Sequence, residues 1–354
     1  MALLNSTGIL DTGTNYTQVY RCSLKENFKY ILLPVSYTLV FVFGLGLNIT
    51  AMYIILFRTK HWKPSTIYMI NLNVCDTLYI LTLPFLIYYY ADKNDWPFGE
   101  LMCKLIRFLF YTNLYGSILF LSCISLHRFL GVCHPMRSLY WMNSHRARLI
   151  SVGIWVIILI LQAPILYFSQ VRHNGNDLVC HDTTIKELFN DFLVYSTVVM
   201  FLFFVLPFGV VLFCNGLMVK KLLDPSVLRE PMSQHSKRKS VKMIIIVLLA
   251  FMVCFLPFHV NRSICYTFRY LDKHDCNILL LSNNAYKVTR PLVSFNSCID
   301  PILYFMAGQS FRNSIYKKST MKSDKSLLPE PDVLGAWKSW PGSSLENRVF
   351  HTVL

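Results

Sequence analysis

The chain consists of long apolar runs that alternate with short polar segments. Seven such runs occur, and each exceeds the roughly 20 residues that a helix needs to cross a bilayer. This pattern predicts an all-α integral membrane protein, a bundle of seven transmembrane helices, with the two termini on opposite sides. The approximate spans are Tyr30–Phe57, Thr66–Tyr90, Lys104–Cys133, Leu149–Phe168, Phe192–Leu222, Val241–Phe268 and Ile278–Met306.

Polar segments flank this transmembrane domain of residues 30–306. Residues 1–29 are expected to be an extracellular head, with glycosylation acceptors at Asn5 and Asn15. The basic amphipathic stretch within residues 307–318 predicts a short eighth helix on the inner leaflet. Residues 319–354 are rich in Ser, Pro and charge, which predicts a disordered cytoplasmic tail. Its last residues, His351–Leu354, suit capture by a PDZ domain, although so short a motif also arises by chance.

Composition and charge agree with a membrane protein. The 354 residues carry a net charge of +15 and a mean hydropathy of +0.42. Lys and Arg concentrate after the first, third, fifth and seventh runs, which is the positive-inside pattern. It predicts a multi-pass plasma-membrane protein with an extracellular N-terminus and a cytoplasmic C-terminus. No nucleic-acid-binding motif accompanies the basic charge, so we expect membrane lipids and no nucleic acid as partners.

The seventh run carries charges at membrane depth. Lys287, Arg290, Ser294 and Ser297 recur at helical spacing and share one face, and Asp300 follows. Each such charge costs at least about 2.5 kcal/mol on insertion scales, so a cavity or a partner is expected beside it. Snorkelling to the interface is the alternative, and it suits Lys287 better than Arg290, which lies a turn deeper.

Two other runs carry basic and aromatic residues in their outer halves. Arg107, Tyr111 and Tyr115 recur every four residues, and His259 and Arg262 lie on one stripe of the sixth run. In a bundle these stripes converge into a cationic cup with an aromatic floor. The predicted ligand-binding residues are Arg107, Tyr111, Tyr115, Asp182, Phe258, His259, Arg262, Lys287 and Arg290.

The cup has more cations than it can neutralise. Asp182 in the outer loop can pair with one arginine, and the other cations need an anion. A nucleoside triphosphate fits, because arginine binds phosphate oxygens through two donors and the aromatic rings can stack on a base. The chain has no phosphate-binding loop of the G-x-x-x-x-G-K-S/T type, so a nucleotide would be a signal and the protein no enzyme. Solvation of Arg107, helix packing by the tyrosines, an interior role for His259 and snorkelling of Arg262 are the alternatives.

Eleven cysteines divide by position. Seven lie in the spans or near the cytosolic face and are expected to be small apolar fillers. The four at expected outside positions suggest two disulfides, whose pairing composition leaves open. These four are Cys22, Cys103, Cys180 and Cys276.

Taken in order, the motifs of the spans resemble the rhodopsin-like G-protein-coupled receptors. The marks include Leu72 with Asp76, His127-Arg128-Phe129, Cys254-Phe255-Leu256-Pro257 and Asp300-Pro301-Ile302-Leu303-Tyr304. Within this family the chain is similar to the nucleotide receptors, and most similar to the subgroup that responds to UTP and ATP. The stretches Lys104–Tyr115, Cys180–Thr183, Cys254–His259 and Ala285–Pro291 carry this finer match.

The resemblance implies an extracellular nucleotide as ligand and a Gq-type G protein, phospholipase C, calcium release and arrestin downstream. It implies the disulfides Cys103–Cys180 and Cys22–Cys276. It also implies a polar cavity that holds an allosteric sodium ion, with no other metal or cofactor; physically, two carboxylates at low dielectric need a cation or a proton, and a water network without an ion is the alternative. The cavity residues are Asp76, Asn113, Ser117, Asn296 and Asp300, and the G-protein-coupling and switch residues are Arg128, Phe255, Pro257, Pro301 and Tyr304.

Two positions depart from the wider family. His127 stands where an acid would hold Arg128 in a resting salt bridge, and Phe255 replaces the usual Trp near Pro257. Both departures also occur in the nucleotide subgroup. A receptor for another anion, such as a dicarboxylate or a lysophospholipid, is the alternative within the fold. A transporter or channel is the alternative from another class, and the lack of inverted repeats argues against it.

Overall fold

A computed structural model of the chain describes residues 27–59, 62–134, 136, 143–174, 177–180, 188–223, 234–271 and 276–307. The chain divides into two units, Met1–Phe311 and Arg312–Leu354, and all described residues belong to the first. The glycosylation sites Asn5 and Asn15, the eighth helix and the tail lie outside the described residues.

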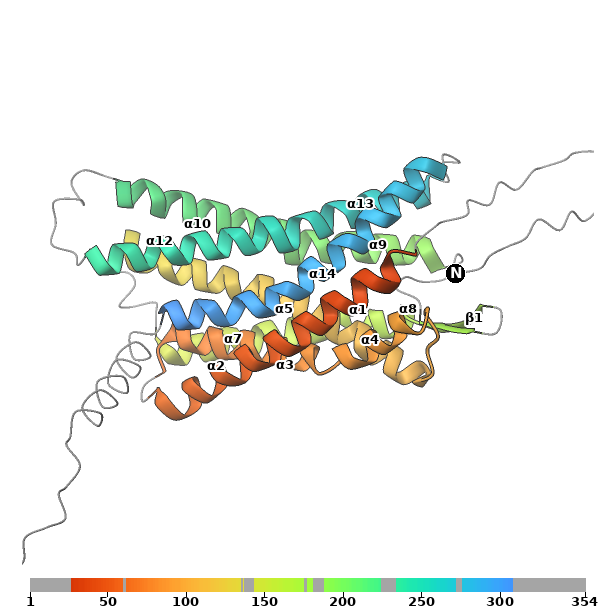
Figure 1. The fold of residues 1–354 in the computed structure, drawn as a ribbon. Coiled ribbons are helices and arrows are strands. Elements are labelled where there is room, and N and C mark those ends of the chain that lie inside the picture. Colours follow the sequence, from red (N-terminus) through yellow and green to blue (C-terminus); the bar gives the residue numbers. More distant parts are fainter. Residues whose placement is uncertain are drawn as a thin grey trace, which may run out of the picture. The chain divides into compact units, whose positions relative to one another are not determined.

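Seven helical spans run alongside one another (Figure 1). The first comprises α1 (Lys29–Leu39), a π-helical segment (Val40–Gly44) and α2 (Leu45–Arg58), and the second α3 (Pro64–Ile80) and α4 (Leu83–Ala91). The third is α5 (Gly99–Cys133), and the fourth is α7 (Ser144–Gln162) with α8 (Pro164–Phe168). The fifth joins α9 (Phe189–Met200), a π segment (Phe201–Val205) and α10 (Leu206–Leu223), and the sixth α12 (Gln234–Leu249), a π segment (Ala250–Phe255) and α13 (Leu256–Tyr270). The seventh is α14 (Cys276–Ala307).

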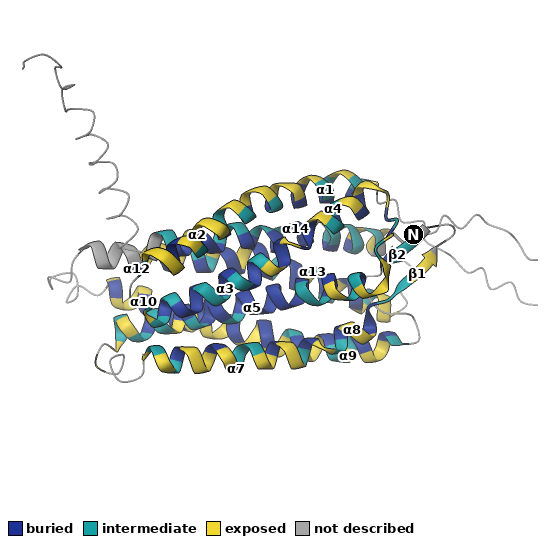
Figure 2. Cartoon of the chain, turned by 90° about the horizontal axis from the view of Figure 1, so that it is seen from below, coloured by how far each residue is buried: buried dark blue, intermediate teal, exposed yellow. Residues whose placement is uncertain are grey.

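The seven predicted runs are thus confirmed as helices, although several helices extend beyond the apolar run. Six spans are long and apolar enough to cross a membrane by length and composition alone. The seventh, α14, has 32 residues and carries the three charges Lys287, Arg290 and Asp300. Many large apolar side chains on the outer surface are exposed, while the centre of the bundle is buried (Figure 2). Such an apolar exterior is expected where lipid is the solvent.

Prolines divide several spans into segments. Pro84, Pro164, Pro207 and Pro257 each occupy the first or second position of the segment that begins there. Proline has no N–H group and its ring crowds the preceding turn, so the helix ladder loses a bond at that point. The widened π segments directly before Pro207 and Pro257 are where the chain accommodates this loss.

Asn48 joins three helices at the centre of the bundle. Pro301 cannot donate to the carbonyl of Ser297, and the Nδ2 of Asn48 donates to that oxygen instead at 2.8 Å. The same Nδ2 donates to Gly44, and the Oδ1 of Asn48 accepts from the Nδ2 of Asn73 at 2.9 Å. Asn48 is fully buried. These bonds hold α2, α3 and α14 together.

The hairpin of β1 (Val171–Asn174) and β2 (Asp177–Cys180) lies at one end of the bundle (Figure 1). The strands are antiparallel, with Val171 opposite Cys180. A disulfide joins Cys180 to Cys103 on α5, as the resemblance implied. The backbone N–H of Trp96 donates to the carbonyl of Leu178 at 2.8 Å and ties the hairpin to the loop before α5. The seven cysteines expected as fillers are thiols, namely Cys75, Cys123, Cys133, Cys214, Cys254, Cys265 and Cys298.

Candidate functional site

Three arginines lie buried in the half of the bundle that carries the hairpin. Arg107 of α5, Arg262 of α13 and Arg290 of α14 are 2%, 4% and 2% exposed. Burying a cation is costly unless hydrogen bonds, rings or an anion compensate for the lost water. The structure therefore confirms that these arginines do not snorkel to the surface, and their surroundings show what compensates for burial.

Arg262 is held by aromatic side chains. Its guanidinium carbon lies 4.8 Å from the ring centroid of Tyr111 and 5.3 Å from that of Tyr266. Its Nη1 donates to the hydroxyl oxygen of Tyr115 at 3.3 Å, and Tyr111 and Tyr115 stack on each other. Its Nε is buried and has no hydrogen-bond partner. Within the described part of the chain no carboxylate forms an ion pair with Arg262.

Arg290 and Arg107 occupy the neighbouring side of the same region. The Nη1 of Arg290 donates to the hydroxyl of Tyr90 on α4 at 3.1 Å, and its guanidinium lies 5.7 Å from the ring of Phe110. The Nη2 of Arg107 donates to the carbonyl of Cys180 at 3.3 Å. Arg107 thus links α5 to the hairpin beside the disulfide.

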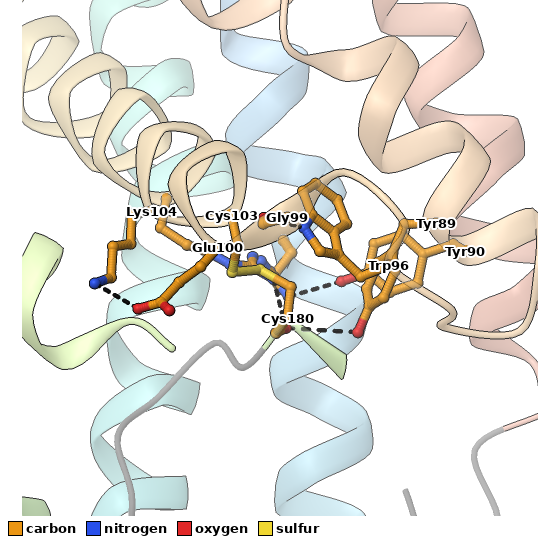
Figure 3. Close-up of a disulfide and its surroundings, with 10 residues drawn as sticks. Tyr89, Tyr90, Trp96, Gly99, Glu100, Cys103, Lys104 and Cys180 are labelled. Carbon is orange, nitrogen blue, oxygen red and sulfur yellow. Dashed lines mark hydrogen bonds and ion pairs between the residues drawn. A yellow bond between two sulfur atoms is a disulfide. The ribbon is translucent and has the colours of Figure 1, made fainter. Parts of the chain in front are cut away.

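Figure 3 shows how the disulfide and the loop before α5 close this end of the bundle. The hydroxyl of Tyr89 also reaches the carbonyl of Cys180, at 3.5 Å. Trp96 is fully buried and donates through Nε1 to the carbonyl of Gly99 at 2.8 Å. The second predicted disulfide, Cys22–Cys276, involves residues whose side chains lie outside the described part, and so does Asp182.

The other predicted ligand-binding residues take different positions. Phe258 is fully buried and meets Phe110 and Tyr286 edge-on and tilted. His259 is 1% exposed and stacks on Phe204 with ring centroids 4.1 Å apart. Both ring nitrogens of His259 lack hydrogen-bond partners, so packing alone does not satisfy this histidine. Lys287 is half-buried, one turn from Arg290 toward the start of α14.

A polar cavity lies deeper, around two buried carboxylates. The Oδ1 of Asp76 accepts from the Nδ2 of Asn113 at 2.8 Å and from the Oγ of Ser297 at 2.7 Å. The Oδ2 of Asp300 accepts from the Nδ2 of Asn296 at 2.6 Å. The predicted cavity residues are therefore close together. Buried atoms without partners remain there, namely Asp76 Oδ2, Asp300 Oδ1, Asn296 Oδ1 and Ser117 Oγ.

The predicted switch residues lie in the other half of the bundle or at the π segment. Arg128 lines a small cavity between α5, α10 and α12, and Phe255 is fully buried at the end of the π segment before Pro257. The hydroxyl of Tyr304 lies 3.0 Å from the Oγ1 of Thr59 at the end of α2. Pro301 lies inside α14, where it frees the carbonyl that Asn48 occupies.

Sequence reasoning missed several residues that hold the arginines. Tyr90, Phe110 and Tyr266 contact the guanidinium groups. Tyr266 follows Arg262 by one helical turn, so the four-residue stripe on the sixth run could have found it. Tyr90 could not be found in that way, because its contact with Arg290 depends on how the second and seventh spans pack.

Comparison with known proteins places these features in a family. The model of the 7 transmembrane receptor (rhodopsin family) matches residues 47–304. Purinoceptor 2 of Mus musculus is 52% identical over 290 residues, which are 82% of this chain and 78% of the relative. Purinoceptor 4 of Homo sapiens is 46% identical over 315 residues, which are 89% of this chain and 85% of the relative. Purinoceptor 1 of Gallus gallus is 42% identical over 315 residues, with 87% and 85% covered.

Proposed function

The chain belongs to the rhodopsin family of seven-transmembrane receptors, and from this premise we propose that it is a G-protein-coupled receptor for extracellular nucleotides of the UTP and ATP type. It is a receptor and not an enzyme. The similarity to the purinoceptors supports this function across more than four fifths of the chain.

The observation that carries the proposal is the set of buried arginines. Arg107, Arg262 and Arg290 come from three helices and lie among aromatic rings below the hairpin. A triphosphate chain carries several negative charges and offers oxygen pairs that match the fork of a guanidinium. Tyr111 and Tyr115 are the rings available for the base and the ribose. Arg262 already has ring faces and one hydroxyl around it, so a phosphate would supply the acceptor that its Nε lacks.

Signalling follows from the other half of the bundle. The protein is a multi-pass protein of the plasma membrane, and the loop charges support an extracellular N-terminus and a cytoplasmic C-terminus. Ligand would favour an arrangement in which the sixth span opens at Pro257 and exposes Arg128 to a G protein. We expect the Gq type, with phospholipase C and calcium release, arrestin as a later partner and a PDZ protein at Thr352–Leu354.

The carboxylate cavity fits a sodium ion. Asp76 and Asp300 each keep one oxygen without a partner, and Asn296 and Ser117 add further oxygen atoms. Oxygen donors with two negative charges suit a hard cation, and these four residues would hold it. The ion would supply the positive charge that stabilises both carboxylates at low dielectric.

The test is a calcium recording in cells that lack their own nucleotide response. UTP, ATP, UDP and ADP are applied in turn, and the same panel is repeated in cells without Gq-type α subunits. A triphosphate response that disappears in the second cells is the expected result. Silence to all four nucleotides, with the receptor at the surface, would transfer the assignment to another anion. A nucleotide-driven current or uptake without any G protein would instead indicate a transporter or channel.

A further inference from the structure

A small cavity lies between α5, α10 and α12, in the half of the bundle away from the hairpin. Apolar side chains from the three helices line it together with three polar groups, Ser125, Arg128 and Asn215. It has room for about one water molecule or one halide ion. Its position matters because α12 belongs to the sixth span, which the proposed activation would move.

The three polar groups have no partners. The Oγ of Ser125, the Nε of Arg128 and the Nδ2 of Asn215 are all buried without a hydrogen bond. Ser125 and Asn215 are 3% and 2% exposed. Leaving a buried donor unsatisfied costs about 1–3 kcal/mol, and more for a charged group, so three in one cavity indicate something that binds there.

No acid of the surrounding helices can fill this role. The sequences of α10 and α12 contain no Asp or Glu, and Glu100, the acid of α5, lies in its first turn at the other end. His127 precedes Arg128 and is engaged elsewhere, because its Nδ1 lies 3.0 Å from the Oγ of Ser65 on α3. The guanidinium therefore has no carboxylate from these elements.

We propose that this cavity binds a chloride ion. Arginine Nε and the asparagine amide nitrogen only donate hydrogen bonds, and a serine hydroxyl can donate too, so the lining is suited to an acceptor with negative charge. The ion takes the place of the missing carboxylate beside Arg128 and bridges α5 to α10. Its release accompanies the outward movement of α12, which makes it a brake on basal activity.

The test measures thermal unfolding of the full-length receptor in nanodiscs, with about 150 mM of the sodium salt of chloride, bromide or gluconate. Sodium stays constant, and gluconate is too large for the cavity. Chloride and bromide are expected to raise the unfolding midpoint by about 2 °C or more over gluconate. Ser125→Ala and Asn215→Leu should abolish this difference. Ser122→Ala is the matched control and should keep it, because the Oγ of Ser122, one turn away, already donates to the carbonyl of Ile118 at 2.7 Å.

His127→Asp separates an anion site from a merely structural role. The new carboxylate beside Arg128 should make the halide redundant, so the salt difference disappears and basal G-protein activation falls at least about threefold. A midpoint that is the same in all three salts would mean that water fills the cavity and would overturn the proposal. A halide effect that survives in both Ser125→Ala and Asn215→Leu would place the ion elsewhere, such as beside the outer arginines, and would overturn it equally.

Discussion

Replacing Arg262 in two steps tests whether its fork or only its charge recognises the ligand. Arg262→Lys keeps a positive charge at nearly the same place. It removes the planar group that lies over the rings of Tyr111 and Tyr266 and that donates to Tyr115. Arg262→Ala removes the charge as well. The two variants should therefore lose nucleotide potency by different amounts.

The sizes follow from burial and chemistry. Two unit charges 4 Å apart at an effective dielectric constant of about 20 attract by roughly 4 kcal/mol, and Arg262 is 4% exposed, so water screens it little. Part of this attraction is offset because the phosphate must also be desolvated. Loss of one charge-assisted hydrogen bond costs about 1.5–3 kcal/mol. We expect Arg262→Lys to raise the half-maximal UTP concentration about 10- to 30-fold and Arg262→Ala at least about 100-fold.

The assay is a calcium concentration–response curve at matched surface expression. Arg269→Ala is the control, because Arg269 lies on the same helix but is exposed and packs over Phe189 outside the cup. Its curve should shift less than about threefold, which corresponds to roughly 0.7 kcal/mol. If Arg262→Ala behaves like Arg269→Ala, Arg262 does not bind phosphate. If Arg262→Lys matches the wild type while Arg262→Ala does not, the fork geometry is irrelevant and a point charge suffices.

Three further outcomes test the scaffold and the inner cavity. Asn48→Ala should destabilise the receptor by about 2–3 kcal/mol, since it removes three buried interhelical or intrahelical bonds, whereas Thr50→Ala should lower the unfolding midpoint little; equal midpoints would contradict this. Cys103→Ser should sharply reduce ligand binding and surface expression, because a lost disulfide costs about 2–5 kcal/mol and releases the hairpin; normal binding after this change would show that the hairpin holds without it. Asp76→Asn should abolish any difference in agonist affinity between sodium and a large organic cation at about 150 mM, and a retained difference would argue against the sodium site.

The fold was predictable from the sequence because bilayer thickness imposes a minimum length on every span. Apolar runs and loop charge were enough to find all seven helices. The breaks at Pro84, Pro164, Pro207 and Pro257 could also be read directly. Helix ends could not, because α5 and α7 begin at Gly99 and Ser144, beyond the apolar runs, where capping and loop contacts decide.

The site was predictable only along each helix. The four-residue spacing of Arg107, Tyr111 and Tyr115 placed them on one face, and all three are buried together. Contacts between helices were beyond such reasoning. The partnership of Arg290 with Tyr90 depends on how α14 approaches α4, and the stack of His259 on Phe204 depends on how α13 approaches the fifth span.

The two polar regions of the bundle are connected through Tyr79. Its hydroxyl lies 2.7 Å from the Oγ of Ser294, which also donates to the carbonyl of Arg290 at 3.4 Å. Its ring meets Phe110, the ring beside the guanidinium of Arg290. One turn before Tyr79 on α3 lies Asp76, the carboxylate of the inner cavity. A ligand that pulls Arg290 toward its phosphates therefore acts on a helix whose next turns are bonded to α3 at Tyr79 and Asp76. Because packed helices shift as rigid bodies between discrete arrangements, displacement of α14 at the arginines must change the geometry around the carboxylates as well.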